Sequence, residues 1–64
     1  MIQLVRTVTL ERIIDERQPV GLFLTRGAGA WVAVDNSTGD AWTEDFKHLL
    51  TAIRWLHGKF EISG

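Results

Sequence analysis

The chain has 64 residues, of which 45% are apolar and 23% are charged, and its net charge at pH 7 is −1. A chain of this length buries only about 60% of the surface that its unfolded form exposes, so we expect one small domain over residues 1–64. The absence of cysteine excludes disulfide bonds, thiolate zinc sites and thiol catalysis. The longest apolar run, at 30–34, is too short for a signal peptide or a transmembrane helix, so we expect a cytoplasmic protein with no membrane contact.

The first predicted element is a short helix over residues 9–16. Thr9 supplies a capping hydroxyl. Leu10, Ile13 and Ile14 follow it with the i, i+3, i+4 spacing of one helix face. Pro19 disfavours a helical conformation at the residue before it, so the helix is expected to end at residues 17–18.

A β-hairpin is predicted next, because the segments 20–26 and 30–35 are rich in β-branched and aromatic residues. The two segments flank a loop at 27–29 that contains two glycines, which is a typical hairpin signal. A third strand is expected at 41–46, after a cluster of turn-forming residues at 36–40.

The length of the hairpin loop decides which strand residues lie opposite each other. With three loop residues Phe23 lies opposite Ala33. With two loop residues it lies opposite Val34, and different residues of the two strands share each face of the sheet. We expect three loop residues, which makes both faces of the sheet apolar. The first face then holds Leu22, Leu24, Val32 and Val34. The second holds Phe23, Trp31 and the third-strand residue Trp42.

A C-terminal amphipathic helix is predicted because the apolar spacing changes from two residues to 3.6 residues at Phe46. Its apolar stripe consists of Phe46, Leu49, Leu50, Ile53, Leu56 and Phe60. Gly58 is expected to act as a left-handed C-cap, and the tail at 61–64 is expected to be frayed. The element order of helix, hairpin, third strand and helix predicts an α+β fold with a small antiparallel sheet.

One large residue, Trp55, lies off this stripe and on the same outer line of the helix as His48, Ala52 and Lys59. Two interpretations are open: Trp55 belongs to the core beneath the N-terminal helix, or it is an exposed anchor of a protein interface. The sheet raises the same question, because an antiparallel sheet normally has one polar face. Either the two helices cover opposite faces, or one face is buried against another chain. The predicted interaction surface consists of Trp55, His48, Phe23, Trp31 and Trp42.

Four acidic residues and no basic residue occur between Asp35 and Phe46. The oxygen donors from Asp35 to Asp40 would suit a metal-binding loop, but they do not match the calcium-loop pattern. We expect a turn instead, because Asn and Asp side chains bond to nearby backbone groups and Gly39 supplies a positive φ. A third interpretation is an acidic patch that meets a basic partner surface.

Catalysis is not expected, and no cofactor is predicted. His48 and His57 are nine positions apart on one predicted helix, so they point to opposite sides and cannot share a metal. The common hydrolase, metalloprotease and nucleotide-binding motifs are absent from the sequence. A nucleic-acid-associated regulator is an alternative that the net charge of −1 opposes. It would require four arginines to cluster on one surface, namely Arg6, Arg12, Arg17 and Arg26.

The segments 35–46 (DNSTGDAWTEDF) and 53–56 (IRWL) resemble a signature of short proteins carried by phages and mobile elements of Gram-positive bacteria. The resemblance covers about the last half of the chain and implies a small accessory factor that binds a larger partner. The sequence therefore predicts a non-enzymatic protein-interaction or homodimerisation module, whose partner is another protein or a second copy of the chain.

Overall fold

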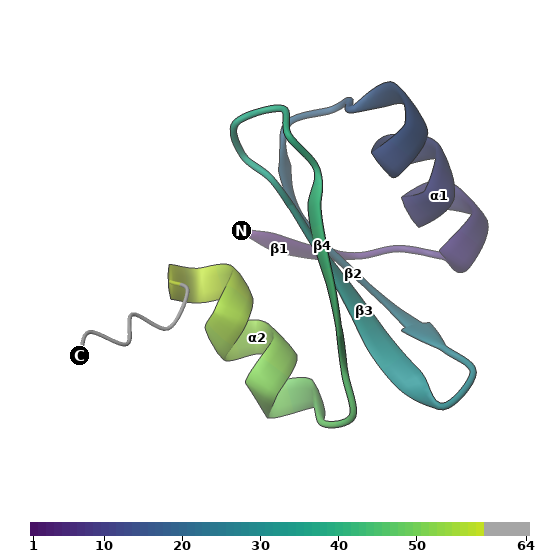
Figure 1. Ribbon diagram of the computed structural model, residues 1–64, viewed down its shortest axis with the longest axis vertical. Coiled ribbons are helices and arrows are strands. Elements are labelled where there is room, and N and C mark those ends of the chain that lie inside the picture. Colours follow the sequence, from purple (N-terminus) through teal and green to yellow (C-terminus); the bar gives the residue numbers. More distant parts are fainter. Residues whose placement is uncertain (59–64) are drawn as a thin grey trace.

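The computed structural model describes residues 1–58, in which two helices lie on opposite faces of a four-stranded mixed sheet (Figure 1). The elements in chain order are β1 (Ile2–Leu4), α1 (Thr7–Glu16), β2 (Gly21–Gly27), β3 (Ala30–Asn36), β4 (Trp42–Phe46) and α2 (Leu49–Gly58). The strands follow the order β1-β2-β3-β4 across the sheet. The predicted α+β fold is confirmed, with one strand more than expected from the sequence.

The additional strand is β1, which pairs with β2 in parallel. Ile2 lies opposite Leu22 and Leu4 opposite Leu24, and the Val5 amide donates a hydrogen bond to the Leu24 carbonyl at 2.9 Å. Parallel neighbours require a crossover connection, and α1 supplies it. A strand of three residues is too short to show a clear alternation of apolar and polar residues, which is why the sequence did not reveal it.

Helix α1 begins two residues earlier than predicted, at Thr7. Its N-cap is Arg6, whose backbone is extended and whose side chain makes no capping hydrogen bond, so the predicted capping role of Thr9 is wrong. The predicted exit is confirmed, because Arg17 adopts the left-handed conformation with φ 57° and its amide donates to the Ile13 carbonyl. This is a common way to end a helix.

The hairpin has a two-residue loop, so the predicted three-residue loop is wrong. Gly27 pairs with Ala30 and Phe23 with Val34. Gly29 adopts a positive φ of 84°, which suits the tight turns that match the twist of paired strands. The consequence is that Phe23 and Val34 share one face of the sheet, and their neighbours along each strand point to the other.

Each face of the sheet packs against its own helix, and this explains why both faces are apolar. On the α1 side the buried residues are Leu10, Ile13, Phe23 and Val34. On the α2 side they are Leu24, Ala33, Ala52 and Leu56. Of the two predicted ways to cover the sheet, the structure shows the one in which the helices lie on opposite faces.

The buried side of α2 is rotated relative to the prediction. Ala52 and Leu56 are buried, whereas Leu50 is 70% exposed and Phe46 belongs to β4 rather than to the helix. The small side chain of Ala52 lets the helix approach the sheet closely, and the exposed Leu50 points away from it. The predicted stripe residue Phe60 and the predicted frayed tail at 61–64 lie outside the described residues.

Candidate functional site

The aromatic residues of the predicted interaction surface occupy different environments. Phe23 is 2% exposed and packs with Leu10 and Ile13 beneath α1. The interpretation that its face of the sheet is left open for another chain is therefore wrong, because α1 covers that face. The idea that the N-terminal helix covers Trp55 is also wrong, since α1 lies on the other face of the sheet.

Trp55 and Trp31 are half-buried on the α2 side, where Phe46 brings them together. The Trp55 and Phe46 rings are tilted, with centroids 5.8 Å apart, and Phe46 lies opposite Trp31 in the β3–β4 pairing. The Arg26 guanidinium lies over the Trp31 ring, with Cζ 5.4 Å from the centroid. These tryptophans contribute to the second core cluster and keep part of their surface in solvent.

Trp42 and His48 lie apart from this aromatic group. Trp42 is 63% exposed at the start of β4, and at about 3.3 Å per residue it lies roughly 13 Å along the strand from Phe46. His48 is exposed in the connection between β4 and α2. The structure therefore does not unite the five predicted residues into one surface.

The acidic segment after β3 forms a turn that is organised by Asn36, which is fully buried. The Asn36 Oδ1 atom accepts a hydrogen bond from the Ala41 amide at 3.0 Å, and its Nδ2 atom donates to the Pro19 carbonyl at 2.8 Å. Gly39 has a φ of 85°. The predicted turn is confirmed, and Asn36 links it to the α1–β2 connection.

The two aspartates of the turn also bond within it. Asp35 Oδ1 accepts hydrogen bonds from the amide and the hydroxyl of Ser37 at 3.1 and 2.6 Å. Asp40 Oδ2 accepts one from the Thr38 hydroxyl at 2.8 Å. Across residues 1–58, no three histidine, aspartate or glutamate side chains form a group that could hold a metal ion.

The four arginines that the nucleic-acid alternative requires occupy several places in the fold. Arg6 and Arg26 line the same hollow. Arg12 lines a different hollow, and Arg17 lies at the opposite end of α1 from Arg6. The nucleic-acid alternative stays a prediction.

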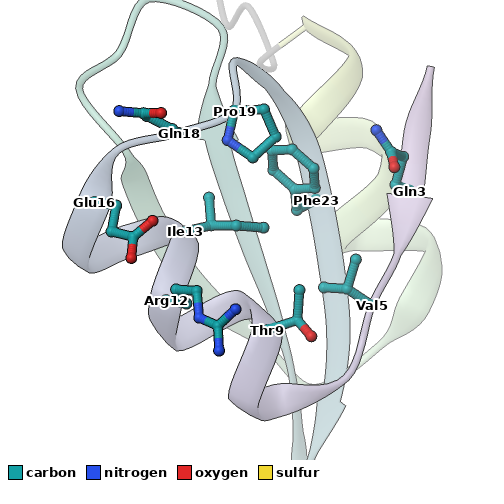
Figure 2. Close-up of a pocket in the computed structure, with 9 residues that line it drawn as sticks. All are labelled: Gln3, Val5, Thr9, Arg12, Ile13, Glu16, Gln18, Pro19 and Phe23. Atoms are coloured by element: carbon teal, nitrogen blue, oxygen red, sulfur yellow. The ribbon is translucent and has the colours of Figure 1, made fainter.

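A groove lies between α1 and the edge of the sheet (Figure 2). It has a volume of about 380 Å³. Its apolar lining consists of Val5, Ile13, Pro19 and Phe23, and its polar lining consists of Gln3, Thr9, Arg12, Glu16 and Gln18. The five polar residues are all exposed, so they form a rim around an apolar floor.

The fold explains why these residues meet. Thr9, Arg12 and Glu16 follow one another at i, i+3 and i+7, which places them on the same side of α1. Gln3 belongs to β1, the outermost strand, and its register partner on β2 is Phe23. Within residues 1–58, β1 pairs with β2 alone, so its outer edge is open.

The sequence pattern does not reveal this groove, because it does not reveal β1. The one available signal was the segment 2–5, in which Gln3 is the only polar residue among apolar ones. A segment this short forms a strand only when β2 pairs with it and α1 packs beside it.

Comparison with protein-family models, curated proteins and solved structures found no match to this chain. The resemblance to phage and mobile-element proteins stays a prediction. Neither helix in the described part of the chain has the length and apolar character needed to cross a membrane.

Proposed function

We propose that this protein is a non-enzymatic interaction module that binds an extended segment of a larger partner protein. The observation that supports the proposal is the groove with the apolar floor, which lies directly beside the open edge of β1. Such an accessory role agrees with the function that the sequence predicts.

An open strand edge presents unpaired backbone N–H and C=O groups, which an extended peptide can pair with as an additional strand. Successive side chains of such a peptide point to opposite faces of the sheet. Every second side chain of a segment bound along β1 would therefore face α1 and enter the groove.

The floor of the groove favours an apolar side chain at that position. Ile13 and Phe23 are 4% and 2% exposed, so they form a fixed surface rather than one that must be assembled on binding. The volume of about 380 Å³ lies within the usual range of ligand sites. The polar rim, which includes Thr9 and Glu16, would remain in solvent around the bound side chain.

A second copy of the chain is the alternative partner that the sequence left open. Self-association through the other sheet edge, β4, is opposed by its charges. An antiparallel pair of β4 strands centred on Glu44 would place Glu44 opposite its own copy. Like charges in directly opposite positions destabilise strand pairing.

The test is a selection of binders from a displayed library of random linear peptides, followed by affinity measurements on a Thr9→Phe variant. Thr9 is exposed and lines the groove, so a phenylalanine there should fill the groove without disturbing the core. We expect selected peptides to lose at least about tenfold in affinity, which corresponds to about 1.4 kcal/mol.

Thr51→Phe is the matched control, because Thr51 is exposed on α2, on the other face of the sheet. This variant should bind like the wild type. Failure to enrich any peptide, or equal binding by Thr9→Phe and Thr51→Phe, would contradict the proposal. Sedimentation of the wild type alone tests self-association, and a dimer that Thr9→Phe disrupts would assign the groove to a second copy.

A further inference from the structure

A second hollow adjoins the groove and is rich in positive charge. It has a volume of about 430 Å³ and is lined by Leu4, Val5, Arg6, Thr7, Thr25, Arg26 and Trp31. A smaller hollow of about 180 Å³ shares Arg26 and Trp31 with it and adds Lys47. None of the residues that line these two hollows is acidic. Arg6 and Arg26 thus line one hollow beside the half-buried Trp31, and Arg26 and Lys47 line the other.

The positive hollow lies next to the groove along the same stretch of chain. Gln3 lines the groove, Val5 lines both the groove and the hollow, and Arg6 lines the hollow. Three residues of extended chain span about 10 Å. A segment that binds along β1 would therefore pass from the apolar floor to the arginines within about two to four of its own residues.

Arg26 is well placed to receive an anion. Its guanidinium lies over the Trp31 ring, 5.4 Å from the centroid, and this contact restricts the side chain before any ligand binds. An arginine can accept a carboxylate with two parallel hydrogen bonds, which makes the interaction directional. The first turn of α1, which begins beside Arg6, contains no acidic residue that would repel the ligand.

We infer that the partner segment carries an acidic residue about two to four positions from its apolar residue, and that this carboxylate binds between Arg6 and Arg26. The inference rests on the proposed function, because it assumes that a peptide occupies the groove. A peptide is favoured over a nucleic acid because the adjoining floor is apolar and because the chain as a whole carries a net charge of −1.

The same peptide selection tests this inference. Enriched peptides should share an aspartate or glutamate at a constant distance from an apolar residue. Replacement of that residue by glutamine or asparagine should weaken binding at least about fivefold in the wild type. The affinity of the acidic peptide should also decrease as the salt concentration rises.

Arg6→Glu should weaken binding of the acidic peptide at least about tenfold, while Arg54→Glu, an equal charge reversal on α2, should leave it unchanged. Arg6 is exposed and its side chain does not cap α1, so the variant should fold. Circular dichroism and the thermal midpoint would verify folding.

The results distinguish a failure of this inference from a failure of the proposed function. If Thr9→Phe abolishes binding but the peptides show no acidic preference and Arg6→Glu binds normally, the inference is wrong and the proposed function stands. If Thr9→Phe has no effect, both are wrong. A third result would also overturn the inference: a single-stranded oligonucleotide binds at low salt, Arg6→Glu abolishes that binding, and no acidic peptide binds. The hollow would then be a nucleic-acid-binding site.

Discussion

At the scale of single residues, Asn36 shows how a polar side chain can determine local structure in a very small protein. Asn36 is fully buried. Its carboxamide accepts a hydrogen bond from the Ala41 amide, just before β4, and donates one to the Pro19 carbonyl, just before β2. The sequence correctly predicted a turn here. It could not reveal the contact with Pro19, because that contact joins residues 17 positions apart.

Asn36→Ala should therefore be strongly destabilising. The substitution removes two hydrogen bonds and leaves the Ala41 amide and the Pro19 carbonyl without these partners. Both hydrogen bonds are partly buried, and an unsatisfied buried group costs about 1–3 kcal/mol, so we expect the free energy of unfolding to decrease by about 1–3 kcal/mol. Urea denaturation measures this change.

Thr38→Ala is a suitable control from the same turn, because the Thr38 hydrogen bond to Asp40 is exposed. Its effect should stay within about 0.5 kcal/mol. A loss for Asn36→Ala no larger than that of Thr38→Ala would show that the Asn36 hydrogen bonds do not hold the turn.

At the scale of elements, the periodicity of the sequence identified both helices but did not fix their orientation. The predicted stripe of the last helix included Leu50, and the predicted outer line included Ala52. The structure reverses the two, since Leu50 is 70% exposed and Ala52 is fully buried. The apolar pattern alone favours large residues at the contact, whereas close packing onto Ala33 requires a small one.

Ala52→Leu should destabilise the protein by about 1–3 kcal/mol, because there is no space between α2 and the sheet for three more carbon atoms. Leu50→Ala should change the stability by no more than about 0.5 kcal/mol, since its side chain is largely in solvent. Chemical denaturation of both variants provides the comparison. Tolerance of Ala52→Leu together with a large loss for Leu50→Ala would support the orientation that the sequence predicted.

The candidate site marks the limit of prediction from sequence in another way. The predicted surface relied on large aromatic residues, but α1 covers the face that holds Phe23, and the shorter loop places Phe23 opposite Val34 instead of Ala33. The groove is built from a three-residue strand and one side of α1, neither of which has a distinctive sequence pattern. A binding site formed by tertiary contacts between ordinary residues leaves little local signal.

At the scale of the whole molecule, two small cores share a single sheet. Strands β2 and β3 contribute alternate residues to each core: Phe23 and Val34 pack under α1, while Leu24 and Ala33 pack under α2. Neither core can therefore loosen without affecting the backbone of the strands on which the other depends. We expect the domain to unfold in one cooperative transition.

The tryptophans make this coupling measurable, because Trp31 and Trp55 pack on the α2 side only. Ile13→Val removes one buried methylene group from the α1 side and should cost about 0.5–1.5 kcal/mol. If the cores are coupled, the denaturation midpoint detected by tryptophan fluorescence must decrease by as much as the midpoint detected by far-ultraviolet circular dichroism. A fluorescence midpoint that stays at the wild-type value while the dichroism midpoint falls would mean that the two faces of the sheet unfold independently.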